Sequence, residues 1–209
     1  MKFYLSSYRM GNEAKKLKKM IPRNRKTAVI MNALDCYDDL ERRKEGEERE
    51  INDLGKVGLK GEILDLRSYF NQKEKLRRKI REFGAFWVTG GNTFVLRQAM
   101  KLSGFDVILK SLVKRRDILY GGYSAGIAVL TPTLKSVEMV DNPRVRPYGR
   151  KSKVIWDGLG IIDYVIVPHY KSKHPESKMC GKIVEHLIQI KVPFKALRDG
   201  EVILMEKRS

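Results

Sequence analysis

The sequence contains few residues that could form disulfides or bind a metal through sulfur. Only two cysteines, Cys36 and Cys180, occur in 209 residues, and neither belongs to a Cys-x-x-Cys pair. This number and spacing exclude a disulfide framework and a zinc-finger type of site. Nucleotide-binding motifs of the G-x-G-x-x-G or Walker type are absent as well. We therefore expect reduced structural thiols, no metal centre and no cofactor.

No apolar stretch of the sequence is long enough to cross a membrane. A spanning helix needs about 18 or more apolar residues. The first five residues, Met1 to Leu5, lead at once into polar residues instead of the apolar core of a signal peptide. We expect a cytoplasmic protein that does not contact a membrane.

Acidic residues are scarce relative to basic ones. The chain has 25 Asp and Glu against 43 Lys and Arg, which gives a formal net charge of +18. Such a charge attracts polyanions, including nucleic acid. The cations are nevertheless spread along the whole chain, and no aromatic-rich RNA-binding signature lies among them. We interpret them as a solvated surface and expect no specific nucleic-acid partner.

Apolar strand-like runs alternate with helical patterns along the chain. This alternation predicts a single α/β domain over residues 1–209, a three-layer α/β/α sandwich with a mostly parallel central sheet. Strands are expected at 3–5, 27–31, 62–66, 85–89, 118–121, 164–168, 194–197 and 202–205, and helices at 10–20, 36–54, 72–82, 92–103, 125–131 and 175–190. The last two strands should form a hairpin, because Asp199-Gly200 between them is a turn signal. Residues 132–160 read as a long loop.

The segment Gly122-Tyr123-Ser124-Ala125-Gly126 fits the pattern G-x-S-x-G. In a nucleophile elbow of this kind, a sharp turn between a strand and a helix exposes the serine hydroxyl. The apolar run before it and the short apolar run after it have the expected strand and helix character. The alternative is an ordinary glycine-rich turn capped by a serine. We take Ser124 as the candidate nucleophile.

A serine nucleophile needs a base, and the chain has three histidines. His169 follows a buried strand directly, at the edge of the sheet to which the elbow also brings Ser124. His186 lies in the middle of a predicted helix, and His174 marks the start of that helix. His169 is therefore the candidate base.

The remaining parts of an acyl-transfer site are an acid and an oxyanion hole. Between Ser124 and His169, the acidic candidates are Glu138, Asp141, Asp157 and Asp163. The oxyanion hole would use the amide of Ala125, which follows the nucleophile, and a second amide from another strand end. The glycine pair at 90–91 follows a predicted strand and can supply that second amide.

Three motifs in this order resemble the peptidase E family, the serine peptidases that include aspartyl dipeptidase and, more distantly, cyanophycinase. They are Gly90-Gly91-Asn92-Thr93-Phe94, the elbow at 122–126, and Pro168-His169-Tyr170. The resemblance implies a fold similar to class I glutamine amidotransferases, a flavodoxin-like arrangement. It also implies a Ser-His-Asp triad with Ser124 as nucleophile and His169 as base, and oxyanion donors at Gly91 and Ala125.

The resemblance also bears on the acid of the triad. The acid of the family follows a Pro-Thr segment after the elbow and closely precedes a proline. Here Pro132-Thr133 is followed by Asp141-Asn142-Pro143, which favours Asp141, and Glu138 fits with a smaller insertion.

We therefore expect a serine exopeptidase that cleaves small peptides through an acyl-enzyme. Specificity for an N-terminal Asp stays open, because the basic loop residues Arg144, Arg146, Lys171 and Lys173 do not align with the pocket that binds substrate carboxylates in the family. An esterase of the α/β-hydrolase type and an inactive, basic binding protein on the same scaffold are the alternatives. The oligomeric state is also open, with a homodimer among the options.

Overall fold

The structure, a computed structural model, describes residues 1–149 and 153–207. Its strands are β1 (Lys2–Ser6), β2 (Lys26–Ile30), β3 (Lys60–Ile63), β4 (Ala85–Val88), β5 (Leu119–Tyr123), β6 (Val165–Val167), β7 (Phe194–Ala196) and β8 (Val202–Glu206). Its α-helices are α1 (Ala14–Met20), α2 (Leu40–Val57), α3 (Lys73–Ile80), α4 (Thr93–Ser103), α5 (Phe105–Leu112), α6 (Ala125–Ala128) and α7 (Ser177–Gln189). Short 3-10 helices are η1 (Asn32–Leu34), η2 (Leu66–Tyr69) and η3 (Lys135–Met139). Across the two described ranges, no helix combines the length and the apolar character needed to cross a membrane.

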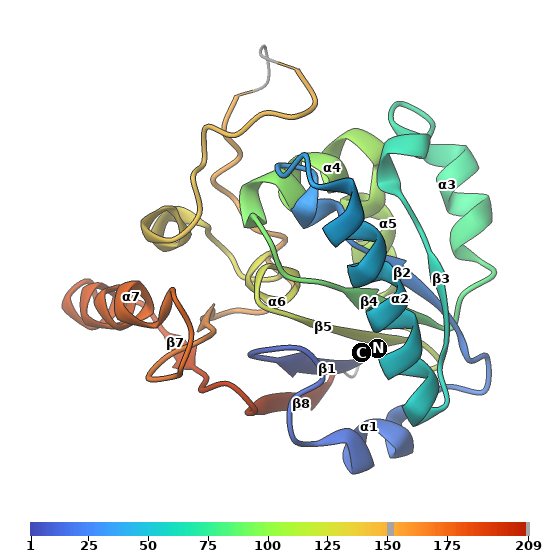
Figure 1. Cartoon of the computed structure of the whole chain (residues 1–209), viewed down its shortest axis with the longest axis horizontal. Coiled ribbons are helices and arrows are strands. Elements are labelled where there is room, and N and C mark those ends of the chain that lie inside the picture. The colour runs from blue at the N-terminus through green and yellow to red at the C-terminus, as the bar shows by residue number, and fades with distance from the viewer. Residues whose placement is uncertain (150–152, 208–209) are drawn as a thin grey trace.

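Six strands form the central sheet, in the order β3-β2-β4-β5-β1-β8. All neighbouring strands are parallel except β8, which pairs antiparallel with β1. Helices cover both faces of this sheet (Figure 1). The predicted three-layer sandwich with a mostly parallel sheet is thus confirmed, and its parallel strands end at one common edge.

Side chains that alternate along the strands fill two apolar layers, one on each face of the sheet. In β1, Phe3 and Leu5 point into the larger layer, while Tyr4 points into the smaller one. The larger layer is closed by α3, α4, α5 and α6, and the smaller one by α1 and α2. In β4, Phe86 and Trp87 divide in the same way. Because both faces are covered, the strands read as continuous apolar runs in the sequence.

Two strands lie outside the central sheet. β6 and β7 pair in parallel with each other, with Val165 opposite Phe194, and α7 covers them. The predicted hairpin between the last two strands is therefore wrong. β7 takes β6 as its partner and β8 takes β1, so the Asp199-Gly200 turn carries the chain from one sheet to the other.

The predicted loop at 132–160 is mostly irregular, with η3 inside it and one isolated bridge between Thr133 and Asp157. Residues 150–152 of this loop lie outside the described residues.

Candidate active site

Ser124 stands at a sharp turn between β5 and α6. Its backbone has φ 51° and ψ −119°, a region that a residue with a side chain rarely adopts. The strain is held by a hydrogen bond from the Ser124 amide to the carbonyl oxygen of Ser7, at 3.2 Å, and by the start of α6. Strained backbone of this kind concentrates at functional sites. The elbow geometry predicted from G-x-S-x-G is present at Ser124.

The last glycine of the elbow is required by close packing. A Cβ atom added to Gly126 would lie 2.1 Å from the carbonyl oxygen of Val88 in the neighbouring strand β4. No side chain fits at that distance. The glycine therefore lets α6 start directly against the sheet, which keeps the turn at Ser124 tight.

His169 follows β6 and is held by a carboxylate. Its ring is buried, and Nδ1 lies 2.7 Å from Oδ1 of Asp199. Because an ionised carboxylate only accepts hydrogen bonds, Nδ1 carries the proton and donates it to Asp199. The other nitrogen, Nε2, is then left with a free lone pair. Burial lowers the pKa of His169 below its usual value, although the hydrogen bond with Asp199 acts in the opposite direction.

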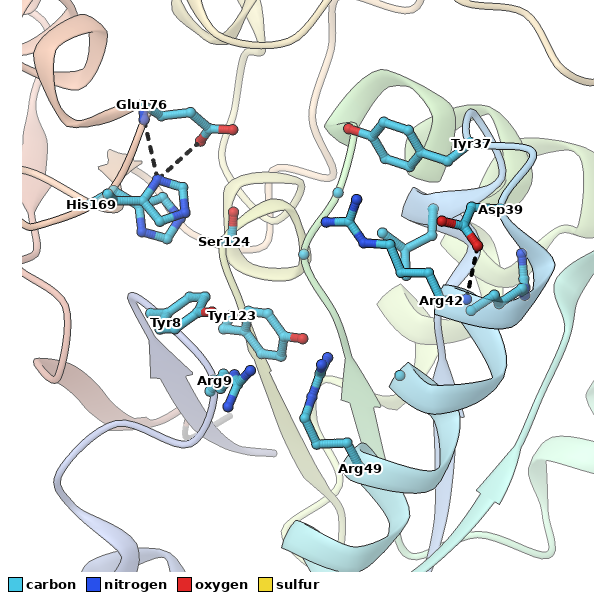
Figure 2. Close-up of a pocket in the computed structure, with 16 residues that line it drawn as sticks. Tyr8, Arg9, Tyr37, Asp39, Arg42, Arg49, Tyr123, Ser124, His169 and Glu176 are labelled. Atoms are coloured by element: carbon cyan, nitrogen blue, oxygen red, sulfur yellow. Dashed lines mark hydrogen bonds and ion pairs between the residues drawn. The ribbon is translucent and has the colours of Figure 1, made fainter.

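Ser124 and His169 line the same pocket, which has a volume of about 380 Å³. Figure 2 shows the serine hydroxyl and the imidazole on the same side of this space. In the described part of the chain, no hydrogen bond joins the two side chains. Such bonds are often long in enzymes without substrate and shorten when substrate binds.

The structure does not bring Asp141 to His169. Oδ2 of Asp141 accepts a hydrogen bond from the amide of Thr93 at 2.8 Å, at the beginning of α4. Burial raises the pKa of Asp141 to about 6. Glu138, the other acid considered for the triad, is exposed on η3. The carboxylate at His169 is instead Asp199, so the chain order of the three groups is Ser, His, Asp.

The loop after β4 lies beside Ser124. Gly91 lines the pocket, and its φ of 133° favours glycine. A Cβ atom at this position would be 2.5 Å from the carbonyl oxygen of Ala33. Asn92 ends the loop and caps α4. Its side-chain oxygen accepts hydrogen bonds from the backbone amides two and three residues further along the chain. The role of Gly91 and Ala125 as oxyanion donors stays a prediction.

Ser7, at the end of β1, contacts three parts of this site. Its hydroxyl accepts a hydrogen bond from the amide of His169 at 2.8 Å and donates one to Oδ1 of Asp199 at 2.9 Å. Its carbonyl oxygen receives the Ser124 amide, as described above. Ser7 is fully buried. One residue that directly follows β1 therefore touches the backbone or side chain of all three candidate catalytic residues.

Arginines form the wall of the pocket opposite Ser124. Arg42 and Arg49 come from α2 and lie across the pocket from the serine (Figure 2). Arg43 is occupied by ion pairs with Asp35 and Glu47. Among the described residues, the guanidinium of Arg42 makes no ion pair. This wall can bind an anionic group of a ligand, because arginine presents several donors to a carboxylate.

A buried carboxylate stands behind that wall. Glu50 accepts hydrogen bonds from Nε1 of Trp87 at 3.0 Å and from the hydroxyl of Tyr123 at 2.8 Å. It also lies 3.4 Å from Nη2 of Arg49. Glu50 thus connects α2 with β4 and β5 and fixes two pocket residues, Tyr123 and Arg49.

Sequence reasoning missed several residues of the site. The sequence indicates only a turn at Asp199 and only the start of a helix at His174. In the structure, the ring of His174 stacks on that of His169 with centroids 3.7 Å apart. One signal for Asp199 existed. His169 and Asp199 each follow a short strand by two or three residues, and parallel neighbouring strands bring such positions together.

The sequence and the fold are similar to those of known proteins. The family model Peptidase family S51 matches residues 15–209. Peptidase E of Streptomyces coelicolor is 30% identical over 148 residues, which cover 68% of this chain and 57% of that protein. A Drosophila melanogaster protein named "Probable alpha-aspartyl dipeptidase" is 29% identical over 140 residues, which cover 64% of this chain and 55% of that protein. The chain spans about three fifths of the length of the curated relatives it matches.

A solved structure also has this fold. It belongs to a protein of Listeria monocytogenes EGD-e assigned to peptidase E, with a TM-score of 0.72 and 22% sequence identity, and it covers 99% of this chain and 98% of its own. The family model covers nearly the whole chain. The chain belongs to peptidase family S51, the peptidase E family.

Proposed function

We propose that this chain is a serine peptidase that hydrolyses short peptides through an acyl-enzyme on Ser124. The observation that carries the proposal is the strained Ser124, which shares a pocket with a histidine whose Nδ1 lies 2.7 Å from a carboxylate. Membership in a peptidase family and relatives named peptidase E support it.

In the proposed mechanism, Oγ of Ser124 attacks the carbonyl carbon of the scissile peptide bond while Nε2 of His169 takes the serine proton. Asp199 keeps the proton of His169 on Nδ1 and stabilises the imidazolium that forms. The amides of Gly91 and Ala125 donate hydrogen bonds to the oxyanion. His169 then gives its proton to the leaving amine, and a water molecule activated by the same imidazole releases the acyl group.

We further propose that the substrate carries an acidic N-terminal residue. Arg42 and Arg49 supply positive charge on the pocket wall opposite Ser124, and Arg42 has no ion pair of its own in the described part of the chain. The name of the Drosophila relative points to the same substrate class. In this proposal, the side-chain carboxylate of the substrate binds to the arginines of α2.

Ser124→Ala tests the chemistry. Hydrolysis of Asp-Leu should fall to the background rate, while Ser111→Ala, which removes a hydroxyl from α5 far from the pocket, should keep full activity. A fluorophosphonate probe should label the wild type and fail to label Ser124→Ala. Full peptide hydrolysis by Ser124→Ala would rule the mechanism out, and turnover of p-nitrophenyl esters without turnover of peptides would favour the esterase alternative.

Arg42→Gln and Arg49→Gln test the specificity. Each should lower kcat/KM for Asp-Leu by roughly tenfold to a hundredfold, the usual effect of losing a hydrogen bond to a charged group. Hydrolysis of Ala-Leu should change little. Arg81→Gln, an exposed arginine outside this pocket, is the matched control. Equal losses for both dipeptides would contradict acidic specificity.

A further inference from the structure

Two histidines and a glutamate gather beside the candidate nucleophile. His169, His174 and Glu176 each offer one ligand atom, and these atoms lie within 4.8 Å of one another. All three come from the segment between β6 and α7. Nδ1 of His174 lies 4.0 Å from Oε2 of Glu176, and Figure 2 shows Glu176 beside His169.

The donor set is the one that zinc prefers. Two imidazoles and one carboxylate occur as the protein ligands of zinc sites that keep a fourth position open. Nitrogen donors favour zinc, copper and nickel, whereas magnesium and calcium require mostly oxygen. A site with two nitrogen donors therefore discriminates against the abundant hard cations magnesium and calcium.

Neighbouring groups already orient these ligands. Asp199 holds Nδ1 of His169, which leaves Nε2 free, and a carboxylate in this position behind a histidine is the usual support of a metal ligand. Two hydrogen bonds fix the segment itself. The hydroxyl of Ser172 accepts one from the Asp199 amide at 2.7 Å, and the Ser172 amide donates one to the hydroxyl of Ser177 at 2.9 Å.

We propose that His169, His174 and Glu176 bind a single Zn²⁺-type ion that inhibits the enzyme reversibly. Binding uses the lone pair of Nε2 of His169, the same pair that would take the proton of Ser124. The bound ion therefore withdraws the base, and the inhibitory part of this proposal rests on the proposed peptidase function. The metal acts as a regulator and is not required for peptide hydrolysis.

One movement is needed for binding. The two rings are nearly parallel, at 8°, and the lone pairs lie in the ring planes. Parallel rings cannot both point at one ion, so one ring must turn. His174 is the more exposed of the two, with 21% of its side chain accessible against 1% for His169, and it is the ring that turns.

Zinc binding can be measured on the full chain without any substrate. Titration with ZnSO4 in competition with a chromophoric chelator should give one ion per wild-type chain, and a hundredfold excess of Mg²⁺ should not displace it. His174→Asn and Glu176→Gln should each weaken binding at least tenfold. His186→Asn, on α7 and outside the cluster, is the matched control and should bind like the wild type.

Activity then tests the inhibition. Zn²⁺ should inhibit Asp-Leu hydrolysis by the wild type over the concentration range in which it binds, EDTA should restore the rate, and His174→Asn should resist inhibition relative to its own zinc-free rate. No binding by the wild type, or binding that neither substitution weakens, would overturn the site. Binding without inhibition would overturn the regulatory role. Because binding is measured without substrate, failure of the peptidase proposal leaves the test of the site intact.

A different observation carries a second inference, which concerns Ser7. Its hydroxyl joins the amide of His169 to the carboxylate of Asp199, and its carbonyl oxygen holds the amide of Ser124. The hydroxyl also lies 3.3 Å from the carbonyl oxygen of Leu197. We infer that Ser7 is a positioning residue, which aligns the histidine and its acid with the nucleophile without touching the substrate.

Ser7→Ala tests this role. It should lower kcat by roughly tenfold or more, since it removes a hydrogen bond to a charged group, and leave KM within about twofold. The rate of fluorophosphonate labelling of Ser124 should fall by a similar factor. Ser103→Ala removes another fully buried hydroxyl, in α4, and should change neither rate.

The labelling rate separates this inference from the proposed function. Labelling of the wild type together with an unchanged rate in Ser7→Ala would overturn the positioning role alone. No labelling of the wild type would overturn both. A rise in KM at constant kcat would assign Ser7 to substrate binding instead and would also overturn the inference.

Discussion

Replacing the buried Asp141 by asparagine should change how the stability of the protein depends on pH. Burial raises the pKa of Asp141 from its usual 3.8 to about 6. The folded state therefore holds a proton more tightly than the unfolded state, and stability falls as pH rises through this window. A shift of roughly 2 units corresponds to about 3 kcal/mol at neutral pH, at 1.36 kcal/mol per unit.

Asparagine cannot ionise, but its oxygen can still accept the hydrogen bond from the Thr93 amide. The difference in unfolding free energy between Asp141→Asn and the wild type should therefore move in favour of the variant by about 2 kcal/mol between pH 4 and pH 7. Urea unfolding at pH 4, 5, 6 and 7 measures this difference directly. The exposed Asp163→Asn should show no such trend. A difference that stays constant over this range, or that moves in favour of the wild type, would refute the reasoning.

Three further substitutions test other contacts. Asp199→Asn should lower kcat for Asp-Leu by roughly 10³- to 10⁴-fold without unfolding the protein, because an amide beside Nδ1 of His169 favours the wrong tautomer. A loss of less than tenfold would argue against Asp199 as the acid. Glu50→Ala should lower the unfolding free energy measured in urea by about 2–4 kcal/mol, since it leaves a buried indole N–H without an acceptor. An unchanged unfolding free energy would show that the carboxylate is dispensable. Gly126→Ala should cost about 1–3 kcal/mol in the same measurement, because its Cβ would meet the oxygen of Val88, and unchanged stability would contradict the tight turn.

Much of the central sheet and two residues of the site could be predicted because their signals are local. An apolar run, a glycine pair and a helical pattern lie next to one another at Gly91 and again at Ser124. The strand before His169 is equally clear, but the structure places it in the small β6–β7 sheet and not, as expected, in the sheet that carries Ser124. These features depend on a few consecutive residues, so the sequence alone predicts them.

The partner of His169 depends on contacts that no short segment encodes. Asp199 reaches the histidine only because β7 pairs with β6 and not with β8, and the Asp-Gly turn fits a hairpin equally well. Asp141 matches the expected chain order of the family triad, but the start of α4 competes for its carboxylate. Arg42 and Arg49 lie in a charged helix whose pattern gives no sign that one face meets a pocket.

The placement of the site on two separate sheets has a mechanical consequence. Ser124 is attached to the central sheet through β5, whereas His169 and Asp199 both follow strands of the small β6–β7 sheet. A displacement between the two sheets would change the distance between the Ser124 hydroxyl and the His169 imidazole. His169 and Asp199 would move together, so the distance between them would stay the same. Changes in packing far from the pocket would thus alter the rate of the proposed reaction through the distance between Ser124 and His169 alone. They would leave the proton of His169 on Nδ1.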